Sequence, residues 1–150
     1  MKRNLLRFGL LCLMMVFAFI AKAQDVTAEW NFKANLPKGI QSIQVEKSVS
    51  AIASTVEGIE MTVDATNGKL KGRSADAQIN KGTILKVPVK SSRDIVTIMN
   101  YGNEKYRATF TIGETSSKDE IIEHNATVDE ATQGYVQIEV AENGYFYGIK

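Results

Sequence analysis

The chain has 150 residues, with 18 basic and 17 acidic side chains, a net charge of +1, one histidine and one cysteine. A single histidine excludes a zinc site built from two or three imidazoles, and a single cysteine excludes an internal disulfide framework. The charge balance does not indicate a nucleic-acid-binding protein, which would carry a marked excess of basic residues.

The N-terminal segment, residues 1–23, has the three parts of an export signal. Basic residues at positions 2, 3 and 7 precede an apolar run over 10–20, and Ala21-Lys22-Ala23 supplies the small residues that signal peptidase accepts. The apolar run is shorter than the ~20 residues of a membrane span. We expect cleavage between Ala23 and Gln24, a secreted or periplasmic protein, and no membrane association afterwards. The alternative is an uncleaved N-terminal anchor.

Cleavage would leave 127 residues and would remove the cysteine, Cys12. It would also remove four of the 18 basic residues and none of the 17 acidic ones, so the mature chain would have a net charge of −3. A chain of this length predicts one domain, residues 24–150, that can bury a hydrophobic core without disulfides.

Short runs of alternating apolar and polar residues follow one another along the rest of the chain, as in half-buried antiparallel strands. We expect strands at 28–32, 43–46, 59–64, 85–89, 95–99, 108–112 and 135–140. Turn signals separate them, for example at Asn67-Gly68. Pro88 cannot donate a ladder hydrogen bond, so its strand is expected at a sheet edge or beside a bulge.

One helical turn is expected in the segment "HNATVDEATQG". Thr127 is placed to cap its N-terminus, Glu130 occupies the capping-box position, and Gly134 ends it. The number of short strands predicts an all-β fold: a single antiparallel β-sandwich, jelly-roll or immunoglobulin-like and similar to a carbohydrate-binding module, with one short helical turn.

Little in the sequence indicates catalysis. His124 has no serine nucleophile motif near it and is expected to be a solvated loop residue. The basic segment "NGKLKGRSAD" does not fit a phosphate-binding loop, which places lysine directly after its second glycine and continues into a helix. We therefore expect no catalytic residue, no metal, no cofactor and no nucleic-acid partner.

Several short motifs carry a resemblance to a known family: "AEWNF", "DATNGKL", "ADAQINKGTILKVPVKS", "ATQGYVQIEV" and "YFYGI". From about residue 27 to 149 the chain resembles the non-catalytic N-terminal β-sandwich module of secreted bacterial pectate lyases and pectinesterases. The resemblance implies an accessory module without enzymatic activity that binds a pectin-like plant cell-wall polysaccharide. The lyase or esterase activity of the family would belong to a catalytic partner domain. The alternative is a structural or interaction domain that packs against or spaces such a domain and binds no sugar.

Sugar recognition uses exposed aromatic rings, and an acidic sugar also needs cations. The candidate ligand-binding residues are Lys69, Lys71, Arg73 and Asp76 on the basic segment, which is expected to be a loop, and Tyr101, Lys105, Tyr106 and Arg107 around a turn. Trp30 has the parity of Phe32 and is expected in the core. Tyr145 and Tyr147 share parity with Ile149 and are also expected to be buried.

Overall fold

The fold was taken from a computed structural model, which describes residues 26–33 and 43–150. The predicted export signal and the cleavage site at Ala23-Gln24 lie outside the described residues. Within the described ranges, no helix is both long and apolar enough to cross a membrane.

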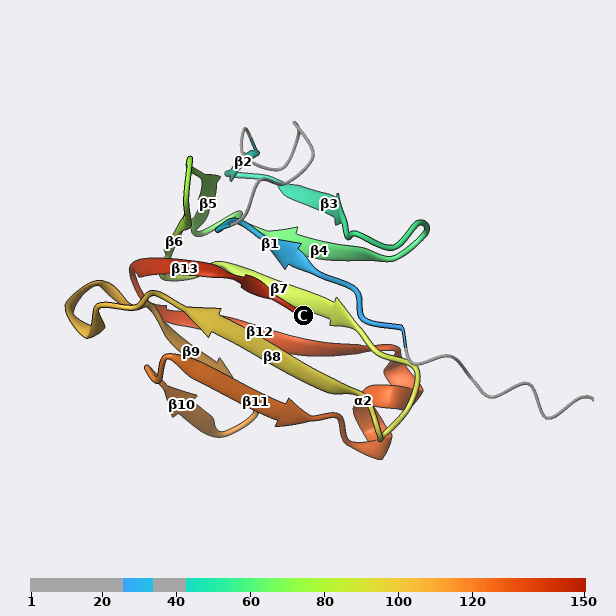
Figure 1. The fold of residues 1–150 in the computed structure, drawn as a ribbon. Helices are drawn as coiled ribbons and strands as arrows, with labels where there is room; N and C mark the ends of the chain where they lie inside the picture. Colours follow the sequence, from blue (N-terminus) through green and yellow to red (C-terminus); the bar gives the residue numbers. More distant parts are fainter. Residues whose placement is uncertain (1–25, 34–42) are drawn as a thin grey trace, which may run out of the picture.

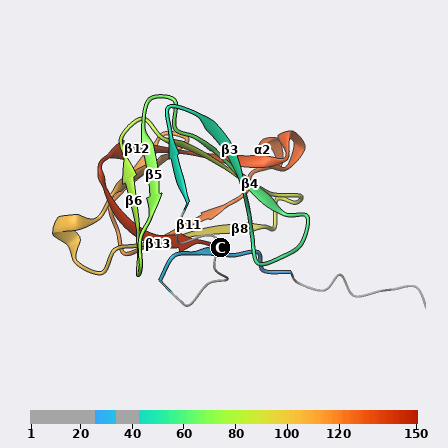
Figure 2. The same ribbon diagram turned by 90° about the horizontal axis from the view of Figure 1, so that it is seen from above.

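Two antiparallel sheets pack face to face (Figure 1). The seven-stranded sheet has the order β11 (Ile121–Asn125), β8 (Ile95–Asn100), β13 (Gly144–Ile149), β6 (Ala77–Asn80), β5 (Lys69–Gly72) and β2 (Gln44–Glu46), with β1 (Trp30–Asn31) beside β13. The six-stranded sheet has the order β10 (Thr115–Ser117), β9 (Thr109–Ile112), β12 (Tyr135–Glu142), β7 (Ile84–Pro88), β4 (Glu60–Asp64) and β3 (Val49–Ala53). Figure 2 shows the layers from above, with β8 and β13 on one side and β3 and β4 on the other. The predicted antiparallel β-sandwich is confirmed.

Eight consecutive strands form four nested antiparallel pairs. β9 pairs with β10, β8 with β11, β7 with β12, and β6 with β13. Successive pairs lie in alternate sheets, so the segment is one long hairpin rolled into a sandwich, which is the jelly-roll arrangement. This topology selects the jelly roll over the immunoglobulin-like sandwich. The earlier strands β2 to β5 extend both sheets, through pairing of β5 with β6 and of β4 with β7.

The core is built from the inward-facing apolar side chains of both sheets. The ring of Phe146 lies 5.5 Å from that of Phe32 and 5.7 Å from that of Phe110, between ring centroids. Trp30 is 1% exposed, and its indole Nε1 donates a hydrogen bond of 2.7 Å to the carbonyl of Ile52 in the opposite sheet. The prediction that Trp30 is a core residue is confirmed.

The predicted helical turn is α2 (Val128–Gln133), which leads into β12. The Thr127 side chain accepts a hydrogen bond from the backbone N–H of Glu130, whose carboxylate accepts one from the backbone N–H of Thr127. Gly134 ends the helix with a φ of 89°, a left-handed conformation that glycine adopts without strain. Both caps predicted from the sequence are confirmed.

The strand that contains Pro88 is central in its sheet, between β12 and β4, and not at an edge as predicted. Pro88 is tolerated because it is the last residue of β7. Pairing with β4 covers only Ile84 to Lys86, so the position of Pro88 needs no N–H donor toward that neighbour.

Candidate functional site

The loop predicted for the basic segment is only partly right: Lys69 and Lys71 lie on a strand of a β-hairpin, whereas Arg73 and Asp76 lie in the turn between β5 and β6. Lys69 and Lys71 lie on the outer face of β5, while Leu70 between them is fully buried. The chain turns after Gly72 and returns as β6. The alternation of lysine and leucine is therefore a strand pattern, and the turn at Asn67-Gly68 precedes it. Lysines on this strand face solvent from a fixed position on the sheet.

The outer face of β13 carries two tyrosines that were expected in the core. Phe146 and Ile149 are both buried, although they are three positions apart and would face opposite sides of a regular strand. This is possible because the pairing of β13 with β8 shifts register between Phe146 and Gly148. Gly148 has a φ of 152°, and a Cβ there would collide with the carbonyl oxygen of Trp30. The bulge turns Tyr145 and Tyr147 outward, so their predicted burial is wrong.

A turn after β8 lies next to these tyrosines and contains the 3-10 helix η3 (Glu104–Tyr106). The buried side chain of Asn100 connects the two ends of this turn. Its amide nitrogen donates a hydrogen bond of 2.8 Å to the carbonyl of Ala108, and its amide oxygen accepts from the backbone N–H groups of Ala108 and Tyr101. Two strands are thus locked together where the turn begins.

Arg107, named from the sequence as a candidate ligand-binding residue, holds this turn together. Its Nε donates 2.6 Å to the carbonyl of Tyr101, and its guanidinium also binds the carbonyl of Gly102 and the carboxylate of Glu120 at 3.0 Å. The side chain is only 14% exposed. Because its Nε and Nη2 bind the turn and Glu120, Arg107 fixes the position of Tyr101.

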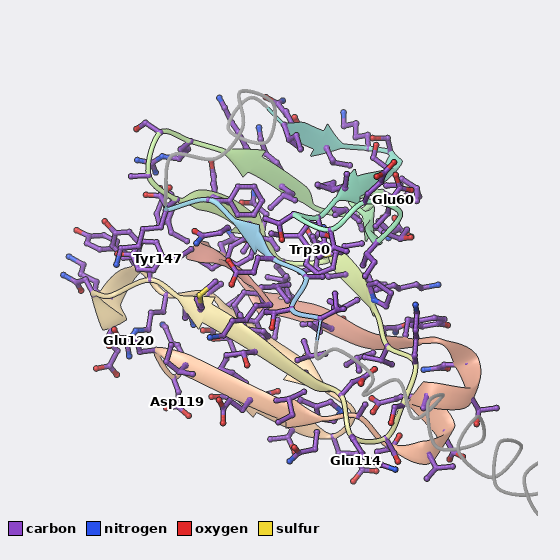
Figure 3. All side chains as sticks on the ribbon, turned by 45° about the vertical axis from the view of Figure 1, so that its right-hand side comes forward. Trp30, Glu60, Glu114, Asp119, Glu120 and Tyr147 are labelled. Carbon is purple, nitrogen blue, oxygen red and sulfur yellow. The ribbon has the colours of Figure 1, made fainter. Side chains whose placement is uncertain are left out.

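The tyrosine cluster, formed by Tyr101, Tyr106, Tyr145 and Tyr147, joins the turn to β13. The ring centroid of Tyr101 lies 5.3 Å from that of Tyr147, 5.9 Å from that of Tyr145 and 6.4 Å from that of Tyr106. The rings are tilted or edge-on to one another, as aromatic pairs prefer. Figure 3 shows Tyr147 at one end of the sandwich, far from Glu60 at the other.

Three cations lie over rings of the tyrosine cluster. Lys33 Nζ is 4.3 Å from the ring centroid of Tyr147, and Arg73 Cζ is 4.7 Å from that of Tyr145. Lys105 Nζ lies 5.5 Å from the centroid of Tyr106. Cation–π contacts hold these side chains over the rings. The result is a surface that presents both aromatic rings and positive charge.

A small recess lies beside the tyrosine cluster. It has a volume of about 160 Å³ and is lined by Gln78, Lys105, Tyr106, Asn143, Gly144 and Tyr145. Gly144 is required at its floor, because a Cβ there would collide with the backbone of Arg107 and Ala108. The recess is smaller than the roughly 300–1,000 Å³ of pockets that enclose a small molecule.

Asp76, a candidate ligand contact, is buried and faces Arg73. It is 6% exposed, and its Oδ1 lies 3.2 Å from the Nε of Arg73 without hydrogen-bonding geometry. The backbone N–H of Arg73 also donates 2.8 Å to the carbonyl of Asp76. Arg73 itself stays 47% exposed at its side chain. The structure therefore places Asp76 as a residue that orients Arg73 toward Tyr145.

Lys69 lies outside the group formed by Arg73, Lys105 and the tyrosine cluster. Its Nζ pairs with the carboxylate of Glu46 at 3.2 Å, and the hydrogen bond and charge of Lys69 lower the pKa of Glu46. Lys71 lies closer to the tyrosine cluster than Lys69 does. It is paired with Gln78 on β6, and Gln78 is paired with Tyr145 on β13. Sequence reasoning missed Lys33, Gln78 and Asn143, which the three-dimensional fold brings to this surface.

His124, expected to be a solvated loop residue, lies on strand β11 and is half-buried. Its Nε2 is 2.8 Å from the carboxylate of Glu130. Burial acts to raise the pKa of Glu130, but hydrogen bonds from the Thr127 backbone and from His124 outweigh it and the pKa is lowered overall. The described residues contain no group of three or more histidine, cysteine or acidic side chains that could hold a metal ion.

Comparison with protein-family models, with curated proteins and with solved structures gave no match. The resemblance to the pectinase-associated module therefore remains a prediction from the sequence motifs.

Proposed function

We propose that this chain is a secreted or periplasmic accessory module, without catalytic activity, that binds an acidic, pectin-like polysaccharide. The observation that carries the proposal is the tyrosine cluster with Lys33, Arg73 and Lys105 over its rings. Aromatic rings pack against the C–H faces of sugars, and guanidinium and ammonium groups bind carboxylates. Arg73 is paired with Asp76, whereas Lys33 and Lys105 make no ion pair within the described residues, and a neutral sugar would make no use of their charge.

The surrounding structure supports such a role because the surface is preorganised. Asn100 and Arg107 fix the turn, Asp76 orients Arg73, and the bulge at Gly148 holds the tyrosines of β13 outward. Side chains that are held in place before binding lose less conformational freedom when a ligand binds. The expected site is therefore local and positive, although the predicted mature chain is acidic overall.

Isothermal titration calorimetry tests the proposal with the mature protein and three polymers: polygalacturonate, highly esterified pectin and a neutral glucan. We expect polygalacturonate to bind most tightly, and we expect its binding to weaken as salt is raised. Tyr106→Ala should reduce affinity about tenfold through loss of one aromatic contact. Arg73→Ala should reduce affinity and also the dependence on salt.

The chain contains a matched control for both substitutions. Lys86 Nζ lies 4.9 Å from the ring centroid of Tyr135, on the outer face of the six-stranded sheet. Lys86→Ala and Tyr135→Ala remove the same chemistry from the other side of the molecule and should leave binding unchanged. Equal losses in the control and site variants would contradict the proposed location. Cleavage of pectin by the purified protein would contradict the absence of catalytic activity.

A second candidate function is a domain that packs against a polysaccharide-degrading partner and binds no sugar. Tyrosine and arginine are the residue types most enriched at the energetic centres of protein interfaces. The tyrosine cluster and Arg73 would serve that role with the same geometry. Absence of heat with all three polymers would favour this function over carbohydrate binding.

A further inference from the structure

The outer face of the seven-stranded sheet continues the site beyond the tyrosine cluster, along one row of residues. The register places Tyr145 opposite Gln78, Gln78 opposite Lys71, and Lys71 opposite Gln44. These residues lie on four neighbouring strands, β13, β6, β5 and β2, and none of them is buried. We call them the cross-strand row.

The chemistry of the cross-strand row is continuous with that of the tyrosine cluster. Gln78 lines the recess beside Tyr145, so the row begins inside the candidate site. Beyond it stand the ammonium group of Lys71 and the amide of Gln44. The side-chain nitrogen of Gln44 donates 3.0 Å to the Glu46 carboxylate and that of Gln78 donates 3.3 Å to Asn80, so both amide oxygens face outward as acceptors for hydroxyl groups. An exposed lysine binds an anion.

Lys71 differs from its neighbours on the same hairpin because it makes no ion pair within the described residues. Lys69 is paired with Glu46 and Arg73 with Asp76. The undescribed residues 34–42 contain no aspartate or glutamate that could pair with Lys71. Within the described residues, the row thus has one cation without an acidic partner, two strands away from the ring of Tyr145.

We propose that the ligand is an extended polyanionic sugar chain that runs across the strands along this row, with Lys71 as a second anion-binding position. This inference rests on the proposed function and specifies its ligand. Neighbouring strands are about 4.8 Å apart, so the row extends for about 14 Å from Tyr145 to Gln44. One strand spacing is comparable to the length of one sugar unit. The row would therefore hold about four units, with carboxylates near Arg73 and near Lys71.

The experiment uses purified oligogalacturonates of two to eight units, titrated into the mature protein by calorimetry. We expect affinity to rise with length up to four or five units and then to level off. Lys71→Ala should lower the affinity of the longer oligomers about fivefold and leave the dimer, bound at the tyrosine cluster, unchanged. Lys86→Ala is the control for removal of an exposed lysine.

A gain-of-function variant guards against loss of binding through misfolding. Gln44 is exposed at the far end of the row, so Gln44→Lys should raise the affinity of the six- and eight-unit oligomers and leave the dimer unaffected. If the dimer binds as tightly as the octamer, or Lys71→Ala weakens every length equally, the cross-strand path is wrong while carbohydrate binding stands. If no oligomer of any length binds, both the path and the proposed function are overturned.

Discussion

Removal of the Glu130 carboxylate should weaken the domain in a way that depends on pH. This carboxylate accepts a hydrogen bond of 2.8 Å from the backbone N–H of Thr127 and lies 2.8 Å from the Nε2 of His124. It therefore connects the first turn of α2 to the edge strand β11. Glu130→Ala leaves the backbone N–H of Thr127 without its capping acceptor. It also removes the carboxylate that is hydrogen-bonded to His124.

The magnitude follows from these two contacts. Loss of a helix cap costs about 1 kcal/mol, and loss of the partly buried hydrogen bond with His124 costs about another 1 kcal/mol. We expect Glu130→Ala to lower the free energy of unfolding by about 2 kcal/mol at pH 7. The corresponding fall in midpoint temperature is about 8 °C for a domain of this size. Glu130→Gln keeps an acceptor for the Thr127 N–H and should lose about half as much.

The pH dependence has a definite sign. The pKa of Glu130 in the folded protein lies below its ordinary value of 4.5. A lowered pKa contributes stability above the unfolded-state value, and this contribution disappears as pH falls through the folded-state value. The difference between wild type and Glu130→Ala should therefore be full at pH 7 and shrink well below pH 4.5.

Urea unfolding followed by the fluorescence of Trp30, the single tryptophan, measures this difference because the residue is buried in the core. A loss below about 0.5 kcal/mol at pH 7 would refute the reasoning and would mean that α2 opens locally before the rest of the domain unfolds. A difference that stays constant from pH 7 to pH 3 would refute the role of the ionised carboxylate.

Three further substitutions test the packing behind the candidate site. Phe146→Ala should cost about 3–5 kcal/mol in urea unfolding, because it leaves a cavity between the rings of Phe32 and Phe110; a loss under 1 kcal/mol would contradict this packing. Asn100→Ala should cost about 1–3 kcal/mol by leaving buried backbone groups unpaired, and unchanged stability would show that they find other partners. Gly148→Ala should destabilise the bulge and also lower the affinity for oligogalacturonate. Unchanged affinity in a less stable variant would show that the bulge is not needed to position the binding residues.

Much of the fold could be predicted from local sequence patterns. The capping box at Thr127 and Glu130, the glycine stop at Gly134 and the core position of Trp30 all depend on neighbours within a few residues. The runs of alternating apolar and polar residues also predicted the antiparallel β-sandwich. The hairpin of β5 and β6 was taken for a loop because each strand buries only two small or isolated side chains, too few to establish a period of two.

The candidate site was only partly predictable, because it depends on register and on one bulge. Parity arguments assume an unbroken strand, and the extra residue at Gly148 reverses the direction of the side chains on one side of it. This reversal is the reason that Tyr145 and Tyr147 face solvent. The distance in sequence between Arg73 and Tyr145 is also too great for any local pattern to connect them. Chemically suitable residue types could be named from the sequence, but their grouping could not.

The nested pairing of β6 to β13 also has a consequence for how the protein reaches its native state. The innermost pair, β9 and β10, joins residues close in sequence, such as Ile112 and Thr115, whereas the outermost brings Ile79 to Gly144. Each pair that forms shortens the loop that the next pair must close, and so reduces its entropic cost. We expect refolding on the millisecond-to-second scale typical of non-local β topologies, with the inner hairpin structured in the transition state. Substitutions there would slow folding, whereas substitutions in β6 or β13, where the binding tyrosines lie, would mainly speed unfolding.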